Sequence, residues 1–599
     1  MKSRSFMMED EVTGKAYDVW LARRLFQYLR PYLILVVLGT LCLLASSACQ
    51  LAGPYLVKVG IDKYIVPGKL EGFLTLIIIY LLAITGDFIS RCAQIYIMNY
   101  LGQKTMYDLR MDLFSHLQRL SLRFFDRNPV GRLVTRATSD VEVLNQLFST
   151  GLVTVIGDLA MIAGIMIVML WMNLKLALLI FSILPVLLVI TFYFRKKMRE
   201  AFRLVRTRLA RINAFLQEAL SGMSIIQLFN RQERTRKRFD TLNLDHMDAY
   251  LQTIFYYALF FPLIELIGTI ALAIILWYGG LSVMEGTLTF GVLVAFIQYV
   301  EKFFKPISDL SEKYNIFQAA AASSERIFRL LDMKDIIPDT PAPTWRDRIE
   351  GRVSFRDVHF AYNQDEPVLR GIDFEVEPGE KIAVVGSTGA GKTTIINLLA
   401  RFYDPQEGEI MIDGINIRNF DKKWLRQNIG TALQDVFIFS GTVKSNIALG
   451  EDNPGMGKIT EAAEAIEADE FIERLPGGYD HELTERGSTL SAGQRQLLSF
   501  ARVMYKNPRI LVLDEATSSV DSHTEYLIQK ALERLIAGRT SLIIAHRLST
   551  IRHVNRIIVM HHGRIAETGS HEELLQHKGI YYNLYQLQYK DQEVVSPGT

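Results

Sequence analysis

The sequence predicts a multidomain protein. An all-α domain of six transmembrane helices with long cytoplasmic helix extensions precedes an α/β domain of the P-loop type. Three observations lead to this fold class. The chain has 599 residues, more than one domain usually holds. Long apolar runs alternate with basic stretches up to about Pro306. The residues after Gly351 have the sequence pattern typical of a soluble α/β domain. The third observation is a phosphate-binding motif set between an apolar strand and a helix.

Six apolar segments are candidate membrane spans, each of which needs about 20 residues. The third and fourth are joined by a short polar turn near Asn173, which predicts a tight hairpin. The sixth is shorter than a full span. Residues 16–30 precede the first span and resemble an amphipathic helix that lies on a membrane surface. The six segments are residues 33–56, 73–97, 147–171, 174–194, 254–278 and 290–304.

The distribution of Lys and Arg predicts the orientation of these spans. A dense basic series runs from Arg195 to Arg238, whereas residues 279–289 contain neither Lys nor Arg. The N-terminus, the long loops and the α/β domain are therefore expected in the cytoplasm. No proline interrupts residues 73–125, and a continuous helix of that length would measure about 80 Å, far more than the membrane core. We expect cytoplasmic extensions that turn near Pro129 and Gly222 and dock the α/β domain.

Residues 1–332 are therefore assigned to the membrane domain and 333–350, with three prolines, to a linker. Residues 351–590 form the α/β domain, and 591–599 are a tail. The motif "KIAVVGSTGAGKTT" is the strongest signal in this domain. In a P-loop, backbone N–H groups surround phosphates, the lysine reaches the β- and γ-phosphates, and the next hydroxyl binds Mg²⁺. The residues concerned are Gly386, Ser387, Thr388, Gly389, Ala390, Gly391, Lys392, Thr393 and Thr394.

The segment "ILVLDEATSSVD" supplies a second part of the predicted site. Its apolar residues, 510–513, predict a strand buried in a parallel sheet. Asp514 at the end of this strand suits a Mg²⁺ site. Glu515 is placed to orient or deprotonate an attacking water.

These motifs, taken in order, resemble the ATP-binding-cassette exporters, specifically half-transporters with one six-helix membrane domain and one nucleotide-binding domain. The resemblance covers nearly the whole chain. It includes "FAY" before the P-loop, "LQDVFIFSGTVKSNI", "LSAGQRQ", "LDEATSSVD" and "IIAHRLSTI". It implies ATP-driven export by a multi-pass protein of a bacterial-type inner (plasma) membrane, with ATP and Mg²⁺ at sites shared by two cassettes.

The resemblance also assigns residue roles. Tyr362 resembles the aromatic residue that stacks on adenine, and Gln434 the glutamine that binds Mg²⁺ and senses water. His546 resembles the histidine on the γ-phosphate, and Asp521 the aspartate that communicates between the two sites. The signature residues Ser491, Gly493 and Gln494 would meet the ATP of the opposite cassette. With Glu515 and Lys392, Gln434 and His546 complete the expected catalytic set.

One residue departs from the family pattern. The usual signature is Leu-Ser-Gly-Gly-Gln, and Ala492 replaces its first glycine. Alanine restricts the backbone φ angle and adds a methyl group near a phosphate. Because Glu515 is the fully competent residue, the sequence slightly favours a heterodimer with a half that bears an intact signature, with a homodimer as the close alternative.

The cargo expected from the resemblance is an amphipathic or hydrophobic drug or lipid, with membrane lipids as neighbours and no role for nucleic acid. A peptide exporter and a non-transporting regulatory membrane ATPase remain alternatives. Ionisable residues inside a membrane usually face a cavity or a partner. Asp87 therefore has two interpretations, contact with cargo or an ion pair with Arg91, whereas cargo or gating contact is favoured for Glu265. Asp158 and Gln298 also lie in the spans.

Overall fold

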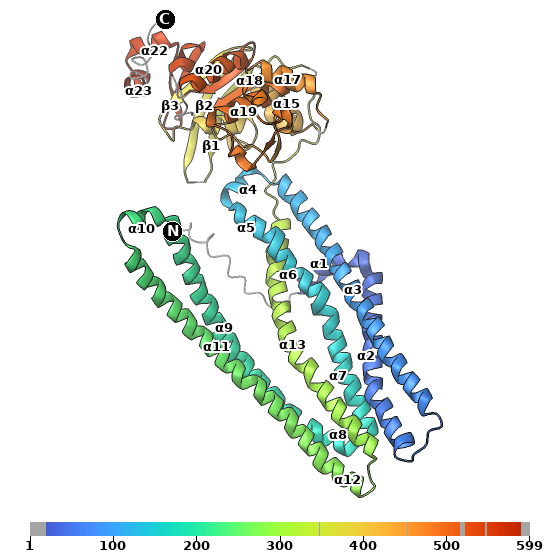
Figure 1. Ribbon diagram of the computed structural model, residues 1–599. Helices are drawn as coiled ribbons and strands as arrows, with labels where there is room; N and C mark the ends of the chain where they lie inside the picture. The colour runs from blue at the N-terminus through green and yellow to red at the C-terminus, as the bar shows by residue number, and fades with distance from the viewer. Residues whose placement is uncertain are drawn as a thin grey trace. The chain divides into compact units, whose positions relative to one another are not determined.

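The computed structural model describes residues 19–346, 348–363, 365–451, 453–514, 522–545 and 548–588. It divides into two compact units (Figure 1). The membrane unit comprises Met1–Gln118 and Val130–Met333, and the α/β unit comprises Arg119–Pro129 and Lys334–Thr599. The short segment before Pro129 therefore belongs with the α/β unit although it is separated from it in the sequence.

The described part of the membrane unit is helical (Figure 1). The longer helices are continued or joined by one 3-10 segment, η1 (Arg30–Tyr32), and by four π-helical segments, η2 (Ile61–Ile65), η3 (Arg136–Asp140), η4 (Leu147–Gly151) and η5 (Ile275–Gly279). These helices are α1 (Val19–Leu29), α2 (Leu33–Gly60), α3 (Phe73–Arg119), α5 (Val130–Thr135), α6 (Val141–Gln146), α7 (Leu152–Met172), α8 (Leu174–Phe181), α9 (Leu184–Ser221), α10 (Met223–Leu228), α11 (Gln232–Ile274), α12 (Gly280–Met284) and α13 (Phe290–Leu331).

Within the described residues, five helical runs are long and apolar enough to cross a membrane: Trp20–Ile65, Phe73–Arg119, Val130–Met172, Leu174–Ser221 and Gln232–Met284. Each contains one of the first five predicted spans. The sixth predicted span stays a prediction. It forms the start of α13, where the charged residues Glu301 and Lys302 follow an apolar stretch.

The predicted hairpin at Asn173 is present. Asn173 separates α7 from α8, and its side-chain oxygen accepts a hydrogen bond of 2.9 Å from the backbone N–H of Leu176. This is the capping contact that favours Asn at a helix start. The fourth predicted span is not one helix, because Pro185 lies in the first turn of α9 and α8 has already ended at Phe181. Proline suits a first turn because its missing N–H has no helical partner there.

The long helix expected over residues 73–125 ends earlier, at Arg119. Ser121 adopts an extended conformation with ψ 158°. Its backbone N–H and its hydroxyl donate hydrogen bonds of 2.8 and 2.9 Å to the backbone and the side chain of Asp335. A short helix, α4 (Leu122–Arg127), follows and ends before Pro129. The break therefore comes from a contact with a residue more than two hundred positions away, which local sequence does not reveal.

Two polar residues of the spans, Asp87 and Asp158, have side-chain partners. Asp87 on α3 accepts hydrogen bonds from Ser46 and Gln50 of α2, at 2.5 and 3.0 Å. Among the described residues it forms no ion pair with Arg91, so that interpretation was wrong. Asp158 on α7 pairs with Lys313 of α13. Glu265 is exposed on α11 in this chain, and contact with cargo remains a prediction.

The α/β unit contains two main sheets. A sheet of order β12-β11-β3-β10-β9-β6 is parallel except at β12, and an antiparallel sheet has the order β2-β1-β4-β5. The strands are β1 (Val353–Ala361), β2 (Pro367–Val376), β3 (Lys381–Gly386), β4 (Glu407–Ile412), β5 (Ile415–Asn416), β6 (Ile429–Ala432), β7 (Gly441–Thr442), β8 (Glu482–Leu483), β9 (Ile510–Asp514), β10 (Thr540–Ile544), β11 (Arg556–His561) and β12 (Arg564–Gly569).

Helices surround these sheets (Figure 1). The short turns are η6 (Ile417–Asn419), η7 (Gly478–Asp480) and η8 (Glu485–Gly487). The helices are α14 (Lys392–Leu399), α15 (Lys422–Asn428), α16 (Val443–Ile447), α17 (Met456–Glu464), α18 (Asp469–Glu473), α19 (Ala492–Lys506), α20 (Ser522–Ile536), α21 (Leu548–Arg552), α22 (His571–His577) and α23 (Ile580–Gln588).

The parallel sheet is buried on both faces. Ile382 and Val384 of β3 belong to a core shared with α14 and the antiparallel sheet, whereas Ala383 and Val385 belong to a core shared with α19 and α20. Strands covered on both faces are apolar at successive positions. This explains why the segments "IAVV" and "ILVL" read as continuous apolar runs, and it confirms the predicted buried strand at residues 510–513.

Candidate nucleotide-binding site

The loop between β3 and α14 has the backbone shape of a phosphate cradle. Gly386 has φ +155° and Gly391 has φ +101°. A Cβ atom at Gly386 would lie 2.4 Å from the carbonyl oxygen of Met560, and one at Gly391 would lie 2.7 Å from Leu369. Both positions therefore require glycine. Between them, Ser387, Thr388 and Gly389 are exposed, so the loop lies open to a ligand.

Lys392 begins α14 and folds back over this loop. Its ammonium group donates hydrogen bonds of 2.7 and 3.1 Å to the backbone carbonyls of Gly386 and Ser387. Burial lowers the pKa of Lys392, and the nearby carboxylate of Asp514 partly opposes that effect. The side chain is thus a cation held at the loop that anionic phosphates would enter.

Thr393 and Asp514 bring the two predicted motifs together. The Thr393 hydroxyl donates a hydrogen bond of 3.3 Å to the carboxylate of Asp514. Asp514 ends β9, which pairs with β10, and β10 pairs with β3, so the carboxyl ends of these parallel strands lie at one sheet edge. Hydroxyl and carboxylate oxygens are the donors that Mg²⁺ prefers. The donor set therefore fits a Mg²⁺ ion.

Gln434 follows β6 by two residues and is exposed. In the register of the sheet, Ala432 of β6 lies beside Leu513 of β9, so Gln434 follows the strand that neighbours Asp514. Gln434 therefore lies in the loop at the same edge as the P-loop. Three other predicted residues, Glu515, Asp521 and His546, lie outside the described residues.

Tyr362 directly follows β1 and is tied to the P-loop helix. Its hydroxyl donates to Thr394 Oγ1 at 3.3 Å and accepts from the side-chain amide of Asn397 at 3.2 Å. Its ring meets the rings of Phe360 and Tyr403 edge-on, with centroids 4.9 and 5.2 Å apart. The residue expected to stack on a base is thus held beside the phosphate cradle.

The signature sequence opens α19, as its capping residues predict. Ser491 accepts a hydrogen bond from the N–H of Gln494, and the Gln494 side chain accepts one of 2.9 Å from the N–H of Ser491. This reciprocal capping box fixes the helix start. Ala492 is the first residue of α19, its side chain is exposed, and it is not among the described residues with positive φ. Its backbone is therefore one that alanine adopts without strain. Gly493, which follows, is buried.

Arg502, which the sequence did not single out, connects this helix to the loop that carries Gln434, and Arg486 of η8 contacts the same loop. Arg502 of α19 donates hydrogen bonds of 2.6 Å to the backbone carbonyls of Phe437 and Asn446. Burial lowers the pKa of Arg502 to about 10. The N–H of Arg486 donates to the carbonyl of Ile438 at 3.0 Å. The Gln434 loop and the signature helix thus form one connected assembly.

A further contact involves α4, the segment before Pro129. The Tyr403 hydroxyl donates a hydrogen bond to the carboxylate of Asp126. Arg127 donates one of 3.1 Å to the backbone carbonyl of Tyr362. The sequence predicted a turn here but not these partners. The available signal was the polar Asp-Arg pair directly before Asn128-Pro129.

Comparison with known proteins agrees with this geometry. The protein-family model for the ABC transporter transmembrane region matches residues 36–307. The family model described as ABC transporter matches residues 369–518. The uncharacterized ABC transporter ATP-binding protein YknV of Bacillus subtilis is 40% identical over 98% of this chain and 97% of its own length. The chain belongs to the ABC transporters.

Two other similar proteins narrow the class of ABC transporter. The ATP-dependent lipid A-core flippase of Syntrophus aciditrophicus is 36% identical over 96% of this chain and 95% of its own length. The structure of a bacterial Atm1-family ABC exporter with ATP bound matches with a TM-score of 0.74 and 29% identity. The alignment covers 95% of this chain and 99% of the Atm1-family chain. The protein is an ABC exporter: a multi-pass membrane protein whose cytoplasmic ATPase domain binds ATP and hydrolyses it to drive transport.

Proposed function

We propose that this ABC exporter moves an amphipathic or hydrophobic compound across the membrane by alternating access, as a dimer of half-transporters. The observation that supports this most directly is the 3.3 Å hydrogen bond between Thr393 and Asp514. It brings the two sequence motifs of an ATPase site together. The similarity to a lipid A-core flippase along nearly the whole chain supports a lipid-like cargo. ATP binding would drive transport only if it favours one membrane state over the other.

In this proposal Thr393, Asp514 and Gln434 hold Mg²⁺, which offsets the negative charge of the phosphates. The backbone N–H groups of residues 386–391 and the Lys392 ammonium bind the phosphates, and Tyr362 stacks on the base. Glu515 orients or deprotonates the attacking water, with His546 and Asp521 in the supporting roles that the family resemblance implies. Ser491, Gly493 and Gln494 of one cassette complete the ATP site of the other.

The choice between homodimer and heterodimer turns on Ala492. The sequence slightly favoured a heterodimer because alanine restricts the backbone. That argument is weakened by the position of Ala492 at the first residue of α19, where a helical backbone is needed. We therefore propose that two copies of this chain suffice for hydrolysis, with a heterodimer as the alternative.

The first test is ATP hydrolysis by the chain purified alone in lipid, beside the Glu515→Gln variant. If the parent chain hydrolyses ATP and Glu515→Gln abolishes this hydrolysis, the result supports the homodimer. Absence of turnover in a folded protein that binds ATP contradicts it and points to a partner half.

A second test uses proteoliposomes with the ATPase domain outside. ATP-dependent accumulation of a fluorescent phospholipid or a lipophilic dye, lost in Glu515→Gln, supports export of amphipathic cargo. ATP hydrolysis without movement of lipid, dye or peptide supports the regulatory ATPase instead.

A further inference from the structure

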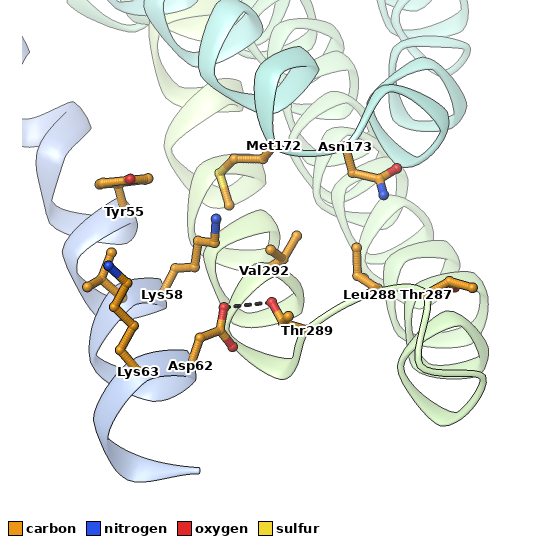
Figure 2. A pocket seen from close by; sticks show the side chains of 11 residues that line it. Tyr55, Lys58, Asp62, Lys63, Met172, Asn173, Thr287, Leu288, Thr289 and Val292 are labelled. Carbon is orange, nitrogen blue, oxygen red and sulfur yellow. Dashed lines mark hydrogen bonds between the residues drawn. The ribbon is translucent and has the colours of Figure 1, made fainter. Parts of the chain in front are cut away.

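A cavity of about 340 Å³ lies inside the membrane unit, at the end of α2 (Figure 2). Its walls come from α2 and η2, from the α7–α8 hairpin and from the start of α13. Its volume lies in the range of small-ligand pockets. The α9–α10–α11 turn lies at the opposite end of this unit (Figure 1).

The membrane topology predicted from the sequence puts this cavity on the outer side of the membrane. The chain leaves α13 at Leu331 and enters the α/β unit at Lys334, so the C-terminal end of α13 is cytoplasmic. The 42 residues of α13 extend about 63 Å at 1.5 Å per residue, more than twice the thickness of the hydrocarbon core. With the predicted sixth span at its start, α13 is expected to place its N-terminal end, which lines the cavity, at the outer surface.

Asp62, the carboxylate that lines this cavity, is already bound to protein groups. It accepts hydrogen bonds of 2.6 Å from the Thr289 hydroxyl and 2.8 Å from the backbone N–H of Gly291 (Figure 2 shows the first). These donors belong to the cap and the first turn of α13, whose unpaired N–H groups favour a negative charge. Asp62 thus ties the end of α2 to α13.

Two lysines give the cavity a positive charge. Lys58 is half-buried, and its ammonium group lies 5.5 Å from the centre of the Tyr55 ring. Lys63 is exposed on the next turn. Among the described residues neither lysine forms an ion pair, although Lys58 and Asp62 are four positions apart on one helix. A half-buried cation without a counter-ion attracts an anionic group strongly, because a low-dielectric surrounding weakens the field less than water does.

The remaining wall of the cavity is apolar. Met172, Leu288 and Val292 contribute hydrocarbon surface (Figure 2). A ligand that is complementary to both the lysines and the apolar wall carries a negative head group and a hydrocarbon portion.

We infer that this outer cavity binds the anionic head group of an amphiphile, a carboxylate or a phosphate, with Lys58 as the principal contact. This inference rests on the proposed export of amphipathic compounds and deepens it by naming the head-group charge. The cavity would hold the amphiphile on the outer side of the transporter, where cargo is released.

The test uses the whole chain, purified in a neutral detergent without nucleotide. Bound ligand is counted by native mass spectrometry during titration with oleate and with 1-oleoyl-glycerol 3-phosphate, and oleyl alcohol serves as the uncharged probe. The variant Lys58→Met keeps the length of the side chain and removes its charge. Lys69→Met is the matched control, because Lys69 is an exposed lysine at the same end of the unit that does not line the cavity.

We expect Lys58→Met to weaken binding of the anionic probes at least tenfold, the loss expected for a hydrogen bond to a charged group. Lys69→Met should change it less than twofold, and Lys58→Arg should restore it. An effect confined to one anionic probe identifies a carboxylate or a phosphate as the head group.

Equal losses in Lys58→Met and Lys69→Met, or equal binding of oleyl alcohol, would overturn the inference. A thermal unfolding midpoint of Lys58→Met close to that of the parent chain verifies that the variant folds. A variant that does not fold is replaced by Lys58→Gln, which is judged by the same criteria. Because binding is measured without nucleotide, the result is independent of the transport assay that tests the proposed function.

Discussion

The guanidinium of Arg127 donates a hydrogen bond of 3.1 Å to the backbone carbonyl of Tyr362, the residue expected to stack on adenine. One position earlier, Asp126 accepts a hydrogen bond from Tyr403, whose ring meets the Tyr362 ring edge-on at 5.2 Å. Tyr362 is in turn bonded to Thr394 and Asn397 of the P-loop helix. A continuous set of contacts thus connects α4 to the phosphate cradle.

Removal of the Tyr403 hydroxyl should weaken the coupling between cargo and hydrolysis. Tyr403→Phe leaves the Asp126 carboxylate without this donor, and a hydrogen bond to a charged group contributes about 1.5–3 kcal/mol. We expect stimulation of ATP hydrolysis by cargo to fall several-fold while basal hydrolysis stays within about twofold. The measurement is phosphate release in lipid with and without cargo. Tyr526→Phe, at an exposed position of α20, is the control. Equal loss of basal and stimulated rates would contradict a coupling role.

Docking of α4 should not change between pH 6 and 9. Burial of Tyr403, followed by its hydrogen bond to Asp126, raises the pKa of Tyr403. A group whose pKa is raised on folding contributes stability that is complete below its unfolded value of about 10 and is lost only as the pH rises through the folded value. Hydrogen exchange of residues 119–129 should therefore keep the same protection across this range. A midpoint near neutral pH would show that another group controls docking.

Substitution of Lys392 should strongly reduce ATP hydrolysis. Lys392→Met removes the buried cation at the phosphate cradle, and loss of one preorganised electrostatic contact reduces turnover by about 10²- to 10³-fold. Lys444→Met, which removes a partly exposed lysine of α16 that pairs with Asp480 in the same unit, should retain the parental rate. The measurement is phosphate release under saturating ATP, with near-parental thermal unfolding of Lys392→Met without nucleotide as the check on folding.

Restoration of the usual signature glycine should bring little gain. Ala492 occupies the first position of α19 with an exposed methyl group. Ala492→Gly lowers the helix propensity of this position, which destabilises the helix by up to about 1 kcal/mol. The substitution relieves no backbone strain. We expect ATP turnover of the chain alone to change less than about twofold. A tenfold rise would show that the methyl group obstructs the opposite site and would favour the heterodimer.

The contact between η3 and α13 should contribute measurably to stability. Asp140 accepts hydrogen bonds of 3.0 Å from Arg326 Nε and from the Ser323 hydroxyl, and its carboxylate is 10% exposed. Asp140→Asn keeps the shape but removes the charge and half of the acceptors, for a loss of about 1–3 kcal/mol.

Thermal unfolding of the whole protein in detergent measures this loss as a lower Tm. The matched control is Asp245→Asn, because Asp245 pairs with Arg208 but its side chain is 43% exposed. Exposed ion pairs contribute at most about 1 kcal/mol. Equal shifts in the two variants would refute a special role for the Asp140 contact.

Much of this exporter was predictable from local sequence because the signals are continuous along the chain. Residues 382–385 of the P-loop strand and 510–513 of β9 are all apolar, since both faces of their sheet are covered. Asn173 and Ser491 carry the side chains that cap helices. Arg502 and Tyr403 were missed because their partners are backbone carbonyls or side chains far away in the sequence.

The sequence by itself determined which segments are apolar enough to enter a membrane, where the phosphate cradle lies and which family the chain resembles, because those properties reside in runs of neighbouring residues. Only the tertiary structure decided that α3 ends at Arg119, that Asp87 bonds to α2 rather than to Arg91, and that Thr393 meets Asp514. Each of these depends on residues brought together from distant positions, the last pair from 121 positions apart. Such contacts form only when the packing of whole elements offsets the entropy of closing long loops.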